Sequence, residues 1–292
     1  MSNNIQLGGE LLARHDEDAD GLGALEVQTA TGTWREFFTE VALGNVPGHY
    51  AVNKFGAAPS GLQVTETDIW GRADATPTQQ IWLPPKAARI HAIKSSSTSD
   101  TWGGGTAASS VVIYGLKTWD TAETSETVQL AGTANVNTAN SYVIIHRMIA
   151  KAQATTTFNR VNVGTITATA ATDTTVTAVI LPGNGQTEMA IYGVPSTQKA
   201  LLYSWYVGID KAQGVAASAD FRLMVNENPN TQIYAYVRKG DISLQSTGSS
   251  THQKTHAVPS KFTGPCIIKI VGSATTADTD GEAGFDLILV DN

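Results

Sequence analysis

The residues with the clearest potential for chemistry are acidic and lie near the N-terminus. Asp16, Asp18 and Asp20 occupy alternate positions before Gly21, as in the first half of a calcium-binding loop. Oxygen ligands at alternate positions suit Ca²⁺, and the glycine permits the sharp turn of such a loop. The bidentate glutamate expected at the twelfth position is missing, since Val27 stands there. The pattern therefore favours a solvated acidic arm over a calcium site.

Two further groups have metal-ligand residue types in unsuitable surroundings. Asp278, Asp280 and Glu282 form a second acidic turn, which we interpret in the same way. His252 and His256 are four residues apart and would share one face of a helix. Their segment is typical of a loop or strand, where this spacing is about 13 Å, and no third ligand follows nearby. We predict no metal site within one chain; matched loops in a trimer would still bring three copies of one histidine around an axis.

Signatures of nucleophilic and cofactor chemistry are missing from the sequence. There is no Gly-x-Ser-x-Gly elbow, phosphate loop or dinucleotide fingerprint where a strand would lead into a helix. The segment Gly103-Gly104-Gly105-Thr106 lacks the lysine and the following helix of a phosphate loop. No pair of carboxylates stands in a context that would raise one pKa, as glycoside hydrolysis requires. We therefore predict no catalytic residues, no cofactor and no enzymatic activity.

Tryptophans are the remaining candidates for binding, because their rings can stack on sugars. Five of them are scattered along the chain: Trp70, Trp82, Trp102, Trp119 and Trp205. Their scatter favours core or interface anchors. A receptor- or glycan-binding module, in which an exposed Trp102 or Trp119 stacks on a cell-surface sugar, stays as an alternative.

Composition limits the partners of the chain. Its 292 residues are 41% hydrophobic and 15% charged, with a net charge of -7. A protein that binds nucleic acid needs a basic face to displace counterions from the phosphates. The sequence has no cluster of lysine and arginine. We predict no nucleic-acid partner. We also expect a surface in which Thr, Ser, Asn and Gln take the place of charged residues, as in β-rich assemblies.

The single cysteine and the N-terminus restrict location. Cys266 lies in the apolar segment Cys266-Ile267-Ile268-Lys269-Ile270, which predicts a buried, inert thiol and excludes an internal disulfide. The N-terminus lacks the basic and apolar regions of a signal peptide, and no stretch of about 18 apolar residues occurs. We expect a protein that is made in a cytoplasm, does not span a membrane, and reaches any external location by assembly or lysis.

The secondary structure that would position these residues is predicted to be strand along most of the chain. From about Trp70 to Val290 the chain is rich in Thr, Val, Ile and Tyr, with Gly, Asn, Ser and Pro as punctuation. Thr124 to Leu130 alternates, with Glu126, Val128 and Leu130 on one face. Short strands at this spacing predict an all-β fold of two consecutive antiparallel sandwich or jelly-roll-like modules. Other expected strands include Ser110–Leu116, Ser141–Met148, Val163–Ala170, Thr174–Leu181, Lys199–Val207, Phe221–Val225, Gln232–Val237, Asp241–Leu244, Ile267–Val271 and Phe285–Val290.

Composition and turn signals predict three parts. Residues 1–60 read as a partly extended N-terminal arm, residues 61–183 as the first β module, and residues 184–292 as the second. Pro182-Gly183-Asn184-Gly185 marks the boundary between the modules. We expect an arm of this kind to gain its order by lying on a neighbouring subunit.

An ordered series of segments carries a family resemblance. The segments are Ser110–Thr133, Asn140–Met148, Asn162–Thr167, Gly185–Pro195 and Gly284–Val290. Together they resemble structural proteins of tailed bacteriophages, many of them marine. The likeness covers about residues 70 to 292 and leaves out the arm. It implies a virion component without an enzymatic site, assembled in the cytoplasm of a bacterial host.

The expected role is that of a head-decoration or cement protein on the capsid surface. Its partners would be the major capsid protein or other virion proteins, and we favour a homotrimer. Linked weak contacts would give strong binding through the arm. We predict Leu11, Leu12, Trp34, Phe37 and Phe38 as interface residues. The alternative within the same class is a tail or neck adaptor, or a fibre-attachment component.

Overall fold

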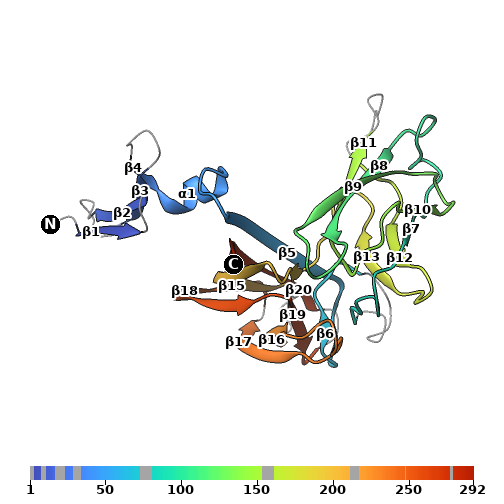
Figure 1. Cartoon of the computed structure of the whole chain (residues 1–292). Coiled ribbons are helices and arrows are strands. Elements are labelled where there is room, and N and C mark those ends of the chain that lie inside the picture. Colours follow the sequence, from blue (N-terminus) through green and yellow to red (C-terminus); the bar gives the residue numbers. More distant parts are fainter. Residues whose placement is uncertain are drawn as a thin grey trace.

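The computed structural model describes residues 3–7, 11–16, 24–28, 34–72, 81–152, 161–210, 217–246, 248–276 and 279–292. Side chains are described from Glu36 onward, except that of Ser246. Of the described residues, 59% are strand and 3% are helix, in several antiparallel sheets, which confirms the prediction of an all-β sandwich fold. The finer jelly-roll description stays a prediction. Figure 1 shows two β-rich bodies side by side, with the N-terminal elements at one end.

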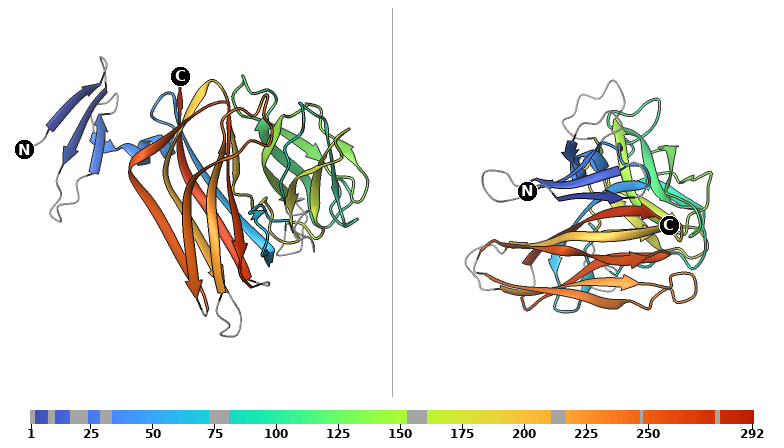
Figure 2. Two further views of the ribbon diagram at one scale, coloured as in Figure 1. Left: turned by 90° about the horizontal axis from the view of Figure 1, so that it is seen from below. Right: turned by 60° about the vertical axis from the view of Figure 1, so that its left-hand side comes forward.

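The larger body is a sandwich of two sheets built from both ends of the chain. One sheet has the order β18-β15-β20-β5, and the other has the order β14-β19-β16-β17 with β6 paired to β19. Figure 2 shows their long strands running together. We call this body the outer sandwich. Its strands are β5 (His49–Leu62), β6 (Thr67–Asp68), β14 (Ile191–Val194), β15 (Gln198–Asp210), β16 (Ala217–Asn226), β17 (Val237–Ser246), β18 (Ser250–Thr263), β19 (Cys266–Ala274) and β20 (Thr279–Asp291).

Alternation of apolar residues forms the core of the outer sandwich. In β15, Ala200 and Leu202 point inward, and the register then shifts between Leu202 and Ser204. A bulge of this kind changes which alternate residues face the core. Trp205 and Val207 are consequently buried in the same cluster, and Tyr203 lies on the other face of the sheet.

The second body, which we call the inner sandwich, lies between β6 and β14 in the chain. Its sheets have the orders β10-β7-β12-β13 and β11-β8-β9. Fully buried residues of both sheets, such as Ile93, Ile113 and Ile166, form its core with Trp82. Its strands are β7 (His91–Ser95), β8 (Ala108–Leu116), β9 (Thr124–Gln129), β10 (Val136–Asn137), β11 (Ile144–Ala152), β12 (Ile166–Ala170) and β13 (Val176–Ile180).

Strand β14 joins the two bodies. Ile191 and, from β19, Ile267 belong to the core of the inner sandwich, whereas Tyr192 and Val194 belong to that of the outer one. Gly193 lies between them, and a Cβ there would come within 2.8 Å of a methyl carbon of Ile144. Glycine at this position therefore lets the sheets of the two sandwiches approach closely.

The sheets divide the chain differently from the predicted boundaries. Residues 49–60, assigned to the arm by their sequence, lie in β5, which pairs with β20 along nearly its whole length. The outer sandwich thus uses chain on both sides of the inner one. The turn at residues 182–185 does lie at the end of the inner sandwich, with Gly183 and Gly185 at φ 85° and 70°.

The N-terminal elements form a small unit of their own. Strands β1 (Asn3–Leu7), β2 (Leu11–Asp16), β3 (Ala24–Gln28) and β4 (Trp34–Glu36) pair in order as an antiparallel meander. Helix α1 (Phe37–Ala42) then leads to β5 and packs on the outer sandwich through Val41, next to Ile288. No helix among the described residues is long and apolar enough to cross a membrane.

Most strands predicted from alternation are confirmed. In β9, Ser125, Thr127 and Gln129 are exposed and Val128 is buried. Gln232–Val237 is wrong as a strand, because β17 begins only at Val237 and turns precede it. The prediction of an acidic turn around Asp280 and Glu282 is also wrong. Both residues lie in β20, where the backbone pairs with β15 and stays extended.

Candidate functional site

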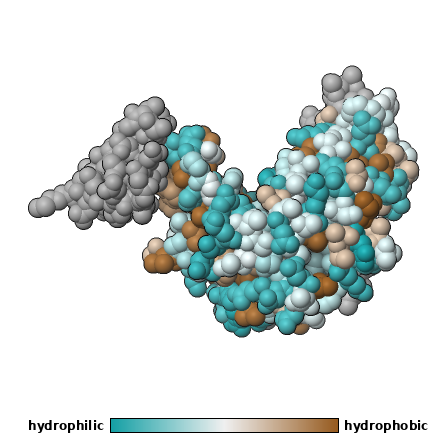
Figure 3. Space-filling view, in the orientation of Figure 1, coloured by the Kyte–Doolittle hydropathy of each residue, from teal (hydrophilic) through white to brown (hydrophobic). Residues whose placement is uncertain are grey.

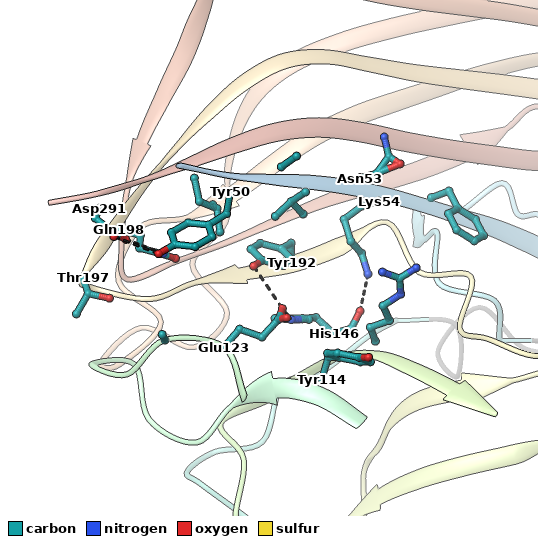
Figure 4. A pocket seen from close by; sticks show the side chains of 16 residues that line it. Tyr50, Asn53, Lys54, Tyr114, Glu123, His146, Tyr192, Thr197, Gln198 and Asp291 are labelled. Carbon is teal, nitrogen blue, oxygen red and sulfur yellow. Dashed lines mark hydrogen bonds and ion pairs between the residues drawn. The ribbon is translucent and has the colours of Figure 1, made fainter. Parts of the chain in front are cut away.

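The principal candidate site is a cleft between the two sandwiches. Its volume is about 690 Å³, within the size range of ligand-binding pockets, which often lie between domains. Figure 3 shows the molecule hollowed between the body that carries β5 and the inner sandwich. The lining comes from both: Lys54 of β5 and Tyr192 of β14 on one side, Glu123 and His146 on the other. We call these four residues the cleft cluster; Figure 4 shows them converging.

A β-bulge directs His146 into the cleft. The pairing of β11 with β8 shifts between Ile145 and Arg147, which leaves His146 as the extra residue. Bulges commonly re-aim side chains beside functional sites. His146 is 1% exposed although it carries a polar ring, and its ring stacks on that of Tyr192 at 4.3 Å between centroids.

Glu123 orients the histidine. Its Oε2 lies 2.5 Å from Nε2 of His146 and accepts a longer hydrogen bond of 3.5 Å from the hydroxyl of Tyr192. A neutral ring that hydrogen-bonds a carboxylate through Nε2 must carry its proton there. The other ring nitrogen, Nδ1, is buried and has no hydrogen-bond partner among the described residues. No nucleophile is therefore held against it in that part of the chain.

Lys54 enters the cleft from β5 and brings a buried positive charge. Its Nζ donates a hydrogen bond of 2.5 Å to the backbone carbonyl of His146, and the residue is 7% exposed. A carbonyl oxygen satisfies one of the three ammonium donors but carries no net charge. The lysine thus contacts the bulge without forming an ion pair there.

Burial controls the ionisation of the cleft cluster. It lowers the pKa of Lys54 from 10.5 to about 7, and the positive charge of Arg147 adds to this effect. It also lowers the pKa of His146, although Glu123 acts in the opposite direction. The pKa of Glu123 would rise on burial, but the hydrogen bond and charge of His146 leave it below its usual value. At neutral pH the cleft therefore holds a neutral histidine, a carboxylate and a lysine that readily exchanges its proton.

A second buried lysine, Lys269 of β19, lies in different surroundings. Its Nζ is 2.7 Å from Oδ1 of Asp68, and it stands 4.1 Å from the centre of the Tyr236 ring. The other carboxylate oxygen of Asp68 accepts the backbone N–H of Trp82 at 2.7 Å. The charges of Lys269 and Asp68 pair with each other, and Asp68 connects β19 to the start of the inner sandwich. The role of this cluster is therefore structural.

The five predicted interface residues fall into two groups. Leu11, Leu12 and Trp34 lie in β2 and β4, where the backbone alone is described. Phe37 and Phe38 begin α1; Phe37 is partly buried against the outer sandwich, and Phe38 is 43% exposed with its ring edge-on to Tyr203. The structure does not bring these two groups to the cleft, and their role as contacts stays a prediction.

The tryptophans separate clearly by exposure. Trp70, Trp82 and Trp205 are fully buried, as predicted for core anchors, and Trp119 is 9% exposed. Trp102 is 56% exposed, so it alone of these five presents its ring for stacking. Cys266 is fully buried, as predicted, and burial raises the pKa of its thiol to about 12.

The remaining metal candidates gain no support from their positions. His252 and His256 lie in β18, not on a helix, and no group of three or more potential metal ligands occurs among the described residues. Residues 17–23, which include Asp18, Asp20 and Gly21 of the acidic segment that resembles half of a calcium loop, lie outside the described residues, as does Asp278.

Comparisons with known proteins give no neighbour for this fold or site. The chain matches no protein-family model, no curated protein and no solved structure.

Sequence reasoning did not identify the cleft cluster. Lys54 and Tyr192 stand 138 positions apart in the sequence, and no spacing rule connects them. The one local signal is His146-Arg147, a polar pair inside the apolar segment Val143 to Met148. A polar pair that interrupts the alternation of a strand indicates a β-bulge. This signal could have identified His146 as a residue with an unusual orientation.

Proposed function

We propose that the protein is a non-enzymatic structural component of a tailed-bacteriophage virion, in the role of a capsid decoration or cement protein. In this role it binds the major capsid protein, assembles as a homotrimer and stabilises the head shell. The resemblance of residues 70–292 to phage structural proteins supports the class. The low charge and the all-β architecture support an assembly role over catalysis.

The observation that carries the proposal is the register of the N-terminal meander. Ladder pairs join Ile5 to Ala13, Ala13 to Val27, and Leu7 to Leu11. The alternate pairs join mostly polar residues, such as Asn4 with Arg14 and Arg14 with Glu26. One of the two alternating sets of this sheet is therefore mostly apolar, with Asn3, His15 and Arg35 at its margins. A sheet with one apolar set is stable when a second layer covers it, and a capsid subunit would supply that layer.

The register also separates two of the predicted contacts. Leu11 belongs to the apolar set through its pairing with Leu7, whereas Leu12 pairs with Gln6 in the alternate set. Neighbouring residues of a strand face opposite ways. A partner that covers the apolar set consequently meets Leu11 and not Leu12.

Particle binding tests the proposal. The variant lacking residues 1–35 removes the meander but keeps α1, whose Val41 is buried against the outer sandwich. We expect it to fold and to be absent from purified particles. Within the full chain, Leu11→Asp should abolish occupancy and Leu12→Asp should retain it. Full occupancy of the deletion variant would show that the meander is not the attachment element.

Copy number separates this role from its alternative. Quantitative mass spectrometry of purified virions should give a simple ratio to the major capsid protein, with hundreds of copies. A count of about six to eighteen, as cyclic symmetry of a tail or collar dictates, would instead support an adaptor or fibre-attachment component.

A glycan-binding module is a second candidate, favoured by the exposure of Trp102. The backbone N–H of this residue donates to the carbonyl of Leu130 at 2.8 Å, so its loop is held against β9 while the ring faces solvent. Binding on a glycan array that Trp102→Ala abolishes would support this role. Trp119→Ala is less informative, because Trp119 is buried and its removal affects packing.

A further inference from the structure

The cleft between the sandwiches runs along an open edge of a sheet. Strand β5 ends the order β18-β15-β20-β5, and six consecutive residues of it, Tyr50 to Phe55, line the cleft. Neighbouring side chains of a strand point to opposite faces. A cavity that touches six residues in a row therefore lies beside the edge of the strand and not over one face alone. Figure 4 shows Tyr50 and Lys54 on one side of this opening and Glu123 and Tyr114 on the other.

The backbone of β5 has no second neighbour along this edge. Its ladder partner is β20, and no other described segment hydrogen-bonds the backbone of residues 50–55. In an antiparallel ladder, every second residue of an edge strand directs its N–H and C=O groups away from the sheet. These outward groups form a row of hydrogen-bonding positions beside the cleft. Such a row is complementary to the backbone of one more strand.

The opposite edge of the same sheet is protected in another way. Strand β18 carries exposed charged side chains such as those of Lys254 and Lys261, and charges on an edge strand oppose pairing with another chain. Along residues 50–55 the single charged residue is Lys54, whose ammonium group donates to the carbonyl of His146 in the inner sandwich. A strand that enters the cleft would thus meet β5 on one side and the inner sandwich on the other. The cleft therefore admits a single extended chain and excludes the edge of a second sheet.

The length and the charge of the cleft define its occupant. Lys54 stands opposite Phe285 in the ladder, and the lining continues to Asp291, six residues farther along β20. At about 3.4 Å per residue this distance is about 20 Å, the length of about six extended residues. The lining holds two cationic and two anionic side chains, those of Lys54, Arg147, Glu123 and Asp291. A charged side chain would lose hydration there without meeting an excess of opposite charge, so an uncharged segment fits best.

We propose that the cleft is a docking site for an uncharged, extended peptide segment of about six residues from a partner protein, which pairs with β5 as an additional strand. Aromatic rings from both walls offer apolar contacts to its side chains, those of Tyr50, Phe55, Tyr114 and Tyr192. The site is separate from the meander surface proposed for particle binding. Peptide binding is measured on the isolated protein, so either proposal can fail without the other.

Binding to an immobilised peptide tests the site. The probe is the acetylated hexapeptide Ser-Thr-Val-Ser-Ile-Thr, attached to a biosensor through a neutral linker, and the full-length protein is the analyte. We expect a dissociation constant below about 500 μM. Peptides with glutamate or with lysine at the third and fifth positions should bind at least about ten-fold more weakly. No binding of the uncharged peptide at about 500 μM protein, or equal binding of the charged peptides, overturns the proposal.

Methylation of the amide nitrogens of the peptide tests for strand pairing. Methyl groups on alternate amides remove the hydrogen-bond donors of one edge of the peptide, and two such peptides cover both edges. The peptide whose methylated edge faces β5 should bind at least about ten-fold more weakly than the unmodified peptide. Unchanged affinity of both methylated peptides would show that the backbone of β5 takes no part, and would overturn the assignment.

Two bulky substitutions locate the peptide in the cleft. Ala122 and Thr197 are exposed residues of its lining, so Ala122→Trp and Thr197→Trp fill the space without disturbing either core. Each should weaken peptide binding by about ten-fold or more. Ala171→Trp, in the exposed turn after β12 and outside the cleft lining, is the matched control and should bind as the wild type does. Wild-type affinity in both cleft variants would place the peptide elsewhere and overturn the proposal.

Discussion

Lys54 and Lys269 lie on opposite sheets of the same sandwich, and both are 7% exposed. Lys269 has a carboxylate at 2.7 Å and an aromatic ring beneath its ammonium group. Lys54 has a carbonyl oxygen as its hydrogen-bond partner, and the charges of Arg147 and Glu123 act on its pKa in opposite directions. Both lysines are thus buried to the same degree, and the group that contacts each ammonium decides its effect on stability. Lys269, in direct contact with a carboxylate, stabilises the fold, whereas Lys54, whose ammonium contacts a carbonyl oxygen, lowers stability by its burial.

The pH dependence of stability should show the largest difference. The folded-state pKa of Lys54, about 7, lies below its unfolded value of 10.5, so the folded protein binds fewer protons between these values. Stability therefore rises with pH from 7 to 10.5, by up to about 5 kcal/mol, and falls as pH decreases through this range. Urea unfolding of the wild type and Lys54→Met at pH 7, 8.5 and 10 measures the slope. An equal slope in both proteins would assign it to other groups.

Breaking the paired site should cost nearly as much. Asp68→Ala leaves Lys269 buried without its carboxylate and removes the acceptor of the Trp82 N–H, so we expect a loss of about 3 to 5 kcal/mol in the free energy of unfolding. Chemical denaturation at pH 7 gives the value. Asp241→Ala, at the exposed ion pair with Arg238, is the matched control and should leave the denaturation midpoint unchanged. A similar small effect of Asp68→Ala would mean that the pair contributes no more than a surface pair.

Replacing each lysine by methionine should move stability in opposite directions. At pH 7 Lys54→Met should raise the free energy of unfolding by about 2 kcal/mol, because it removes a buried charge that no carboxylate of the described residues contacts directly. Lys269→Met should lower it, because Asp68 then remains buried and unpaired. Thermal unfolding of the two variants side by side is sufficient. Destabilisation by both would show that Lys54 is stabilised by its hydrogen bond to His146 more than it is penalised by burial.

The smallest expected effect concerns Glu123. Glu123→Gln weakens the hydrogen bond to His146 and should cost about 1 kcal/mol at pH 7, since the carboxyl side chain is 39% exposed and partly screened. The pKa of Glu123 is lowered in the folded protein, so its contribution is present above about pH 4.5 and is lost as pH falls through the folded-state value. The difference between wild type and variant should therefore shrink in acid. A difference that persists at pH 3 would point to packing instead of charge.

The sequence predicted the strands that bury one face, and missed those that do not. Thr124 to Leu130 alternates and was identified, whereas β18 exposes most of its residues on both faces and offers no period of two. Strand β5 contains Gly56, Pro59 and Gly61, which resemble turn signals, and its pairing with β20 is too distant to be inferred from local pattern. The cleft was missed for the same reason. Its residues meet through sheet contacts between distant segments, and the bulge at His146 reverses the alternation that would otherwise have placed that ring.

Strand β5 has a consequence for the order in which the protein folds during synthesis. Its ladder partner β20 is translated only after the whole of the inner sandwich. The inner sandwich can close while the ribosome is still working, but β5 must wait through more than 200 residues for its neighbour. During that time its backbone donors and acceptors are open to any other strand nearby. Newly made chains at high concentration therefore risk exchanging β5 with one another, and a chaperone that shields this strand would raise the yield of correctly folded protein.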